Sequence, residues 1–502
     1  GLDDSADDLV IGVGSAVGTT PAIHVDENKK VTIGETGVAQ SIGGIPIYRD
    51  ANDSIYTHDV SGTQSTAEAN TSYGVGALDA ITTGDANTAI GNGTLSGNTT
   101  GANNIAIGKA AINAADAESH NIAIGLNSMS GAINGGEYNT AIGSYTLDAA
   151  LTGDNNVAIG HSAGSSITSG TKTTIVGASA AQSSTTCDDS VIIGYQAAGE
   201  SGTAMTGNDN TFVGSQAGYA HTSGYNNVLI GKKAGYSITT GSRNCFVGYQ
   251  SGDGHDAETH NVGIGEGALG GSIAGGEYNV AVGVYSLDAV TSADNNSALG
   301  YGAGGAVTTG NANVSVGYIA GASITTGADN TCIGNESNVF GADAVHQICI
   351  GSGVQGAANN NITVGKGTGS DRVYNQFITN ATWTRTSDER YKKDITDNTD
   401  CGLDFINELR PVTFKWKAKS EIDPSLPDYD ETQLEPEYDK KMYGLIAQEV
   451  KAALDKHSIT DFGGWDKQGE SGIQAIAQSM FIYPLIKAIQ ELSAKVKALE
   501  DA

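Results

Sequence analysis

A hydroxyl and several cations lie close together in the segment Ser387-Asp388-Glu389-Arg390-Tyr391-Lys392-Lys393. A serine hydroxyl is a weak nucleophile until a base takes its proton. A lysine can be that base only where burial or a neighbouring cation lowers its pKa, and Arg390 or Lys393 can supply a cation beside Lys392. Taken alone, the pattern is more typical of a solvated charged loop, so its meaning depends on the elements around it.

Two further patterns follow this segment. Residues 443–450 read Tyr-Gly-Leu-Ile-Ala-Gln-Glu-Val and predict a helix that runs to Leu454. The chain then closes with three heptads, in which β-branched residues take one core position and leucines take the other. These residues are Ile482, Ile489 and Val496, and Leu485, Leu492 and Leu499. By the usual coiled-coil rule, this composition favours a dimer.

The three patterns, in this order over residues 387–502, resemble the peptidase S74 intramolecular chaperone domain. That domain ends phage tail fibres, endosialidase tailspikes and a few eukaryotic membrane-tethered transcription factors. The resemblance implies a trimer and self-cleavage, because in that family the serine of the motif attacks the peptide bond just before it, with the lysine as base. Carried across to the matching positions, Ser387 is the nucleophile, Lys392 is the general base and Thr386–Ser387 is the scissile bond. The chain would then be a single-turnover serine autopeptidase.

The other polar residues of these motifs are expected to support the structure. Asp388 and Arg390 are expected to hold the turn through an ion pair, and Lys393 stays an alternative base. Gln448 and Glu449 are expected to be structural. We expect no cofactor and no metal.

A repeat fills most of the chain before this segment. The motif Asn-x-x-(Ile/Val/Leu)-Gly recurs mostly every 17 residues, with two intervals of 18, one of 20 and a last one of 14. Gly76 is a weaker first copy. The closing glycines are Gly91, Gly108, Gly125, Gly143, Gly160, Gly177, Gly194, Gly214, Gly231, Gly248, Gly265, Gly283, Gly300, Gly317, Gly334, Gly351 and Gly365.

We call one copy of the repeat a coil, and each position shared by the aligned copies a column. The residue types in these columns predict one short strand in each coil. β-Branched residues alternate with small ones before each glycine, as in Val157-Ala158-Ile159, and the third residue after most of the glycines is Ala, Ser or Thr. A three-residue strand cannot bury a face alone, whereas stacked copies can, so the pattern predicts a β-solenoid whose asparagines stack as ladders.

A higher-order duplication relates residues 120–164 to residues 260–304, at an offset of 140 residues. It places His120 and His260 at matching positions. They could form rings around a threefold axis, but no second ligand lies three or four residues away, which favours ordinary surface histidines.

The repeat, from about Ser72 to Gly365, resembles the β-roll head repeats of trimeric autotransporter adhesins and the 17-residue repeats of phage tail fibres that end in a chaperone domain. We therefore expect a mainly β fold: a trimeric β-roll or β-solenoid rod, followed by a small α/β chaperone domain that ends in a coiled-coil helix. The rod itself is expected to have no catalytic activity.

These patterns divide the chain into four parts. Residues 1–70 form an N-terminal leader or connector, with a β-hairpin expected between 23–26 and 30–34, although a poorly ordered terminus is the alternative. Residues 71–368 form the roll, 369–386 a neck, and 387–502 the chaperone. No proline lies between Pro46 and Pro411, as an unbroken backbone ladder requires.

Composition excludes several classes of partner. The net charge of −30 argues against nucleic acid and anionic membranes, and no apolar run is long enough to span a bilayer. Glycine does not fall at every third position, which excludes collagen. The five cysteines, Cys187, Cys245, Cys332, Cys349 and Cys401, lack metal-site spacing and are expected to be small buried side chains.

The favoured function is a viral tail fibre or receptor-binding fibre on the virion tail, assembled in the host cytoplasm. Its expected partners are two further copies in a homotrimer, a host cell-surface glycan or protein, and other virion tail proteins at the N-terminus. The alternatives are a bacterial trimeric cell-surface adhesin and a fibre that degrades glycans; repeated Ile-Thr-Thr also raises a remote ice-binding solenoid.

Overall fold

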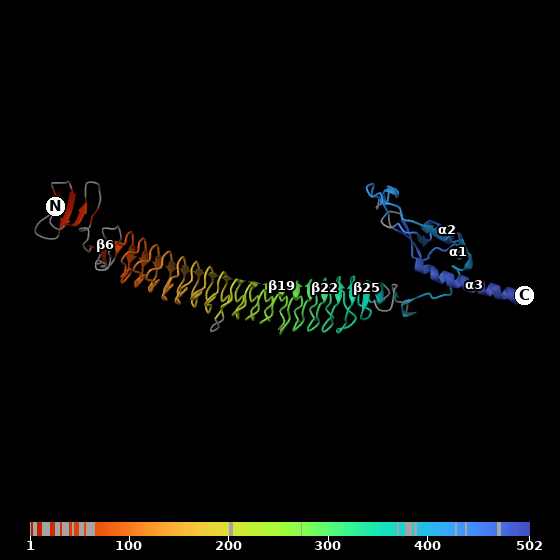
Figure 1. The fold of residues 1–502 in the computed structure, drawn as a ribbon, viewed down its shortest axis with the longest axis horizontal. Helices are drawn as coiled ribbons and strands as arrows, with labels where there is room; N and C mark the ends of the chain where they lie inside the picture. Colours follow the sequence, from red (N-terminus) through yellow and green to blue (C-terminus); the bar gives the residue numbers. More distant parts are fainter. Residues whose placement is uncertain are drawn as a thin grey trace. The chain divides into compact units, whose positions relative to one another are not determined.

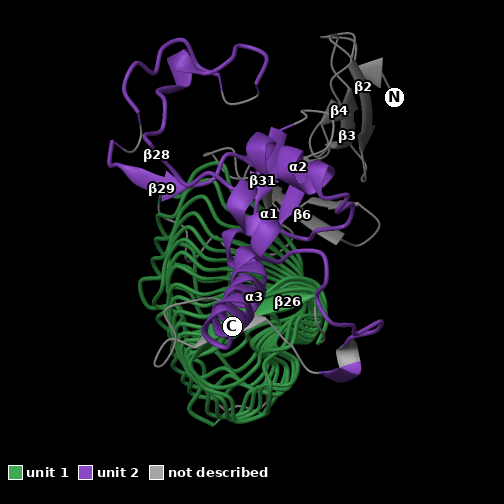
Figure 2. Cartoon of the chain, turned by 90° about the vertical axis from the view of Figure 1, so that its right-hand side faces the viewer, with its two compact units in different colours: residues 1–387 green, residues 388–502 purple. Residues whose placement is uncertain are grey.

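In the computed structural model, the described residues are 66–199, 204–272, 274–368, 371–376, 389–426, 429–436, 439–468 and 473–502; outside these ranges only the short strands named below are described. The chain forms two compact units, residues 1–387 and residues 388–502 (Figure 2). Among the described residues, no helix has both the length and the apolar character needed to cross a membrane.

The first unit is a stack of similar coils (Figure 1). The stack begins with β8 (Thr71–Tyr73) and ends with β25 (Asn361–Gly365), and each of its strands pairs in parallel with the strand of the next coil. Ile105, for example, lies opposite Ile122, one coil later. This pairing confirms the expected β-solenoid of 17-residue turns.

The strands between these two are β9 (Thr88–Ile90), β10 (Ile105–Ile107), β11 (Ile122–Ile124), β12 (Thr140–Ile142), β13 (Val157–Ile159), β14 (Thr174–Val176), β15 (Val191–Ile193), β16 (Thr211–Val213), β17 (Val228–Ile230), β18 (Cys245–Val247), β19 (Val262–Ile264), β20 (Val280–Val282), β21 (Ser297–Leu299), β22 (Val314–Val316), β23 (Thr331–Ile333) and β24 (Ile348–Ile350).

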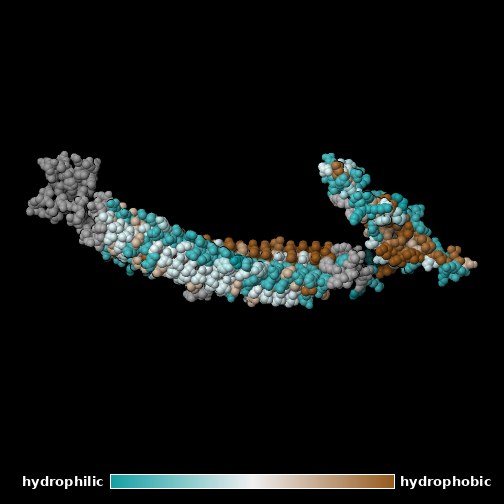
Figure 3. All heavy atoms as spheres, viewed as in Figure 1, coloured by the Kyte–Doolittle hydropathy of each residue, from teal (hydrophilic) through white to brown (hydrophobic). Residues whose placement is uncertain are grey.

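Each strand of the solenoid turns its middle residue into the core. Ala106 is fully buried, whereas Ile105 and Ile107 on either side of it are partly exposed. The middle position of the strand, small in Ala106 and large in Phe212, therefore faces inward, and the flanking positions, most of them β-branched, face outward. As a result, the solenoid carries an apolar outer face, which appears in Figure 3 as a band of hydrophobic residues along one edge of the later coils.

Two positions of each coil fill the same part of the core: the middle residue of the strand and the fourth residue after the closing glycine. Their side-chain sizes are complementary. Ala106 is matched by Ile112, and both are buried. Phe212 is instead matched by Gly218, where an added Cβ would lie 2.8 Å from the phenylalanine ring. A large residue in one column thus requires a small one in the other, which keeps the core close-packed.

Buried asparagines form the predicted ladder. The backbone N–H of Asn104 donates to Asn87 Oδ1 at 3.0 Å, and its side-chain amide donates to the Glu118 carbonyl at 2.8 Å. The same bonds repeat along the stack, for example from Asn121 to Asn104. Each asparagine therefore satisfies backbone groups that the short strands leave unpaired.

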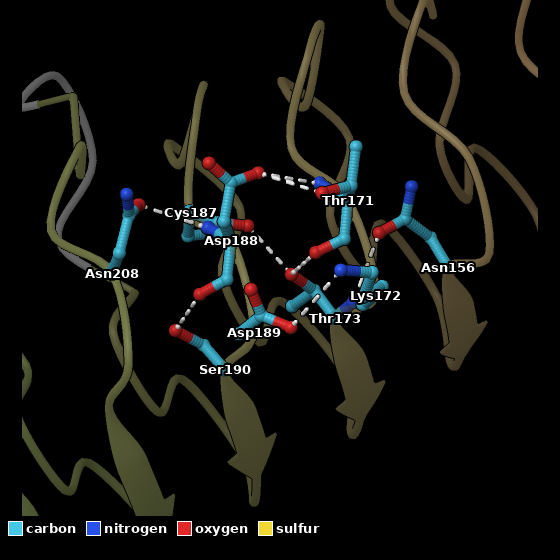
Figure 4. Close-up of polar contacts among 9 residues, drawn as sticks. All are labelled: Asn156, Thr171, Lys172, Thr173, Cys187, Asp188, Asp189, Ser190 and Asn208. Carbon is cyan, nitrogen blue, oxygen red and sulfur yellow. Dashed lines mark hydrogen bonds and ion pairs between the residues drawn. The ribbon is translucent and has the colours of Figure 1, made fainter.

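In two coils of the ladder, Thr173 and Ser190 replace asparagine, so that a hydroxyl group stands where the other coils have an amide (Figure 4). The N–H of Thr173 still donates to Asn156 Oδ1 at 3.1 Å, and its hydroxyl donates to the Cys187 carbonyl at 2.5 Å. Ser190 Oγ accepts the Asn210 N–H at 3.2 Å. A hydroxyl group can therefore take the place of an amide in this column, just before the coil that is lengthened to 20 residues.

The closing glycines adopt a backbone that other residues avoid. Gly108 has φ +131°, and an added Cβ would lie 2.3 Å from the Gly125 carbonyl oxygen. The weak first copy closes at Gly74 rather than at Gly76, because Tyr73 pairs with Ile90, the residue before Gly91. The expectation for Gly76 was therefore wrong by two positions.

Short strands precede and follow the stack. They are β1 (Leu2–Asp3), β2 (Asp8–Gly12), β3 (Pro21–Val25), β4 (Val31–Thr32), β5 (Gln40–Ile42), β6 (Ile45–Arg49), β7 (Ile55–Tyr56), β26 (Arg372–Gln376) and β27 (Thr384–Arg385). The expected hairpin appears as the antiparallel pair β3–β4, and its turn at 27–29 lies outside the described residues. β26 pairs antiparallel with β25 and so ends the parallel ladder.

The second unit is small and mixed. Its elements are η1 (Glu389–Tyr391), α1 (Leu403–Glu408), β28 (Val412–Phe414), η2 (Lys419–Glu421), β29 (Met442–Gly444), α2 (Ala447–Lys456), β30 (Trp465–Gln468), β31 (Ile473–Ile476), η3 (Gln478–Phe481) and α3 (Ile482–Glu500). Phe405, Val450, Leu454 and Phe481 form its core. The long helix expected at the C-terminus is confirmed as α3.

Four of the five cysteines meet their expectation. Cys187, Cys332, Cys349 and Cys401 are buried and free. Cys245 is only partly buried, because it is the first residue of β18 and lies in the outward-facing column.

Candidate functional site

The predicted scissile bond, Thr386–Ser387, falls in the sequence just before the second unit begins at residue 388. Thr386, Ser387 and Asp388 fall outside the described residues, so their predicted roles stay predictions. Description resumes in the helical turn η1, where the backbone N–H of Lys392 donates to the Glu389 carbonyl at 2.9 Å.

The basic residues of the motif lie at the surface of the single chain. Arg390 and Lys392 are both exposed. A lysine that acts as general base needs an ammonium that is desolvated or close to another cation. Lys392 is exposed, so burial within one chain does not desolvate its ammonium.

The second predicted motif builds the scaffold behind this segment. Residues 443–450 run from β29 into α2, which confirms the expected helix. Glu449, on the first turn of α2, forms an ion pair with Arg410 and accepts its Nε–H at 3.1 Å. Both side chains are largely exposed, and the carboxylate raises the pKa of Arg410. This contact supports the expected structural role of Glu449.

The segment after Lys392 is anchored to the C-terminal helix. Asn398 Oδ1 accepts the Cys401 N–H at 3.0 Å, which tightens the turn before α1. The backbone N–H of Leu403 then donates to Glu491 Oε2 on α3 at 2.7 Å. A shallow cavity, lined by Asp397, Asn398, Tyr483, Ile486, Lys487 and Gln490, lies beside this attachment. The start of α1 is therefore tied to α3 by a hydrogen bond.

The predicted coiled-coil residues of α3 are exposed in the single chain. All six core-position residues, Ile482, Leu485, Ile489, Leu492, Val496 and Leu499, face solvent. An exposed apolar stripe of this kind is typical of an interaction surface.

Other notable residues lie on and in the solenoid. His120 and His260 lie at the surface, and each stacks on a tyrosine, Tyr138 or Tyr278. Sequence reasoning passed over these tyrosines, although the 140-residue duplication repeats them.

It also passed over His221 and His255, which are buried in a core column beside phenylalanine rings. The sequence could have shown that these histidines are buried, because Ile238, an aliphatic residue, takes the same position in the coil between them.

Comparison with protein families confirms the resemblance at the C-terminal end. Residues 387–459 match the family model described as chaperone of endosialidase, peptidase S74. No curated protein and no solved structure matches the chain. A β-solenoid of 17-residue turns, followed by a segment that matches this family from Ser387 onward, is consistent with a phage tail fibre that carries an S74 chaperone domain.

Proposed function

We propose that this chain is a phage tail-fibre protein that recognises a host surface and whose C-terminal segment assembles three chains and then releases itself by cutting the Thr386–Ser387 bond. The observation that carries the proposal is the position of the family match, which begins at Ser387, directly after the predicted scissile bond. In the proposed step, the Ser387 hydroxyl attacks the Thr386 carbonyl carbon while Lys392 takes the hydroxyl proton. The Thr386–Ser387 C–N bond then breaks, the protonated Lys392 gives its proton to the freed Ser387 amine, and Thr386 stays joined to Ser387 Oγ as an ester. Water hydrolyses this ester, which leaves a carboxylate on Thr386 and restores the Ser387 hydroxyl.

The exposed apolar face of the solenoid supports assembly. Ile90, Ile142, Ile230, Ile264 and Ile350 all occupy the last strand position and are more than a third exposed. Soluble single chains rarely expose a continuous apolar patch that runs the length of a domain. We propose that three copies bury this face against one another, and that the stripe on α3 forms the coiled coil between them.

Assembly explains why a chaperone is needed. A slip of one whole coil between neighbouring chains would still match strand to strand, because the columns repeat. Two further copies joined first at α3 would fix the register before the solenoids pair. The same step would cover the exposed turn at Lys392, so that cleavage follows assembly.

Electrophoresis of the purified full chain under denaturing conditions tests the proposal. Lys392→Ala is expected to abolish release of the fragment 387–502, whereas Lys393→Ala, the matched control, is expected to preserve it. The reverse pattern would assign the base to Lys393. A wild-type chain that stays intact as a stable trimer would instead favour an adhesin that retains its C-terminal unit.

A further inference from the structure

Two matching aromatic pairs project from the solenoid. The rings of His120 and Tyr138 are stacked with centroids 4.7 Å apart and an angle of 13° between their planes. His260 and Tyr278 are stacked at 4.9 Å and 16°. Tyr138 is 54% exposed and Tyr278 is 52% exposed, so each pair presents ring surface to solvent. We call each pair an aromatic ledge.

Hydrogen bonds to buried carboxylates hold the turn beside each ledge. Each ledge lies where a coil has 18 residues instead of 17. Glu118 is buried and accepts the Gly135 N–H at 2.9 Å, across the lengthened turn. Glu258 accepts the Gly275 N–H at the same distance. A hydrogen bond to a buried carboxylate therefore restrains the backbone beside each ledge, which reduces the freedom that is lost when a ligand binds.

The coil architecture does not require these aromatic residues. The position of His120 is taken by Asn103, Lys172 and Asp189 in other coils, all with φ between 48° and 59°. The residues at this position share only a left-handed backbone conformation, and side chains of several kinds occur there. The chain nevertheless carries the same stacked histidine and exposed tyrosine in both halves of the duplication.

Carboxylates accompany both ledges. Glu137 precedes Tyr138, and its N–H donates to Asp154 Oδ1 at 2.8 Å. Glu277 precedes Tyr278 and makes the same bond to Asp294. An aromatic ring offers an apolar surface to the C–H face of a pyranose, and carboxylates accept strong hydrogen bonds from hydroxyl groups.

We propose that the two ledges are binding sites for neutral hexose units of a surface glycan, an inference that rests on the proposed role as a receptor-binding fibre. The sugar ring packs on the exposed tyrosine, and its hydroxyls donate to the neighbouring carboxylates. Anionic sugars are disfavoured, because the ionisable groups that both ledges share, apart from the histidines, are acidic, and the chain carries a net charge of −30.

The spacing of the ledges predicts a preference for long glycans. Eight coils separate His120 from His260, about 38 Å at the usual strand spacing of roughly 4.8 Å. A polymer that reaches both ledges binds with a higher effective concentration at the second. Oligosaccharides too short to span this distance occupy the ledges independently.

Titration of the full chain with neutral oligosaccharides of glucose, galactose and mannose tests the inference, with sialylated galactosides as the anionic comparison. The double substitution Tyr138→Ala/Tyr278→Ala is expected to weaken binding of the preferred neutral sugar at least about tenfold. Tyr138→Phe/Tyr278→Phe should retain most of the binding, because the ring stays. Tyr195→Ala is the matched control, since Tyr195 is 56% exposed but lies outside the ledges.

Several results would overturn the inference. They are binding that the double alanine variant leaves unchanged, tighter binding of sialylated than of neutral sugars, or no binding of any neutral sugar. A double variant that no longer forms trimers would show that the ledges are contacts between copies instead. Release of the fragment 387–502 and the trimer mass, measured on the same samples, report separately on the proposed function.

Discussion

Two buried histidines show what a single residue can do to this solenoid. His221 and His255 lie in the core against Phe212 and Phe246. Among the described residues, Nδ1 of His221 has no hydrogen-bond partner. Burial lowers the pKa of His221 to about 4 and that of His255 to about 3. Both rings are therefore neutral in the folded coil at neutral pH.

We predict that acid destabilises the solenoid through these two side chains. An unfolded chain binds the protons near pH 6.5, whereas the folded chain resists them, so this contribution to the free energy of unfolding is complete above about pH 6.5 and is lost as pH falls toward 4. The loss is on the order of 3 kcal/mol for each histidine at pH 4. Urea denaturation between pH 7 and pH 4 measures it.

The substitutions His221→Leu and His255→Leu provide the comparison, because Ile238 fills the same column between them. The double variant should lose much less stability over this pH range than the wild-type chain. Equal pH dependence in both proteins would show that other groups cause the acid effect.

At the scale of one coil, stability depends on matched volumes in two columns. Phe246 fills its coil, and an added Cβ on Gly252 would lie 2.3 Å from its ring. The next coil has the opposite arrangement, with Gly263 in the strand and a buried Leu269 four residues after the closing glycine. Leu269 has φ +52°, so this column tolerates leucine in the left-handed backbone.

We therefore predict that Phe246→Ala lowers the free energy of unfolding by about 3–5 kcal/mol, because it leaves a cavity. Adding Gly252→Leu should recover part of this loss by filling the same space from the other column. In the wild-type background, Gly252→Leu alone should destabilise the coil through overpacking. Urea midpoints of the three variants check the prediction, and additive losses in the double variant would contradict it.

The strand pattern also shows where sequence reasoning stops. The spacing from Gly91 to Gly351 predicts the coils, the parallel pairing and the asparagine ladder, because each coil repeats the same local geometry. It does not show that Ala106 faces inward and Ile105 outward, since a three-residue strand presents residues to both sides and the turns decide which side is buried. The sequence also does not predict that a large Phe212 is paired with a small Gly218, because these two positions come into contact only in the folded coil.

At the predicted site, the motif identifies the residues but not their environment. The order of the three C-terminal patterns was sufficient to predict the family that residues 387–459 match. The exposure of Lys392 could not be predicted, because it depends on what covers η1. The apolar stripe of α3 was predictable from its heptads, since all its residues come from one helix.

At the scale of the whole molecule, assembly is predicted to depend on the outward face of the strands. Ile142→Asp places a charge on this face in each copy and should shift the full chain from trimers toward single chains, because three buried carboxylates would repel one another. Tyr145→Asp is the matched control: both residues are 37% exposed, but Tyr145 lies outside the strand. Light scattering measures the mass, and an equal effect of both substitutions would argue against this face as the interface.

The central claim is that the chain cuts itself at one bond, and mass spectrometry of the purified protein with N-terminal sequencing of the small fragment tests it most directly. The account predicts a fragment that begins at Ser387 and ends at Ala502, and a single intact chain when the same protein carries Ser387→Ala. An uncut wild-type chain, a fragment with another first residue, or the same fragment from the Ser387→Ala protein would contradict it.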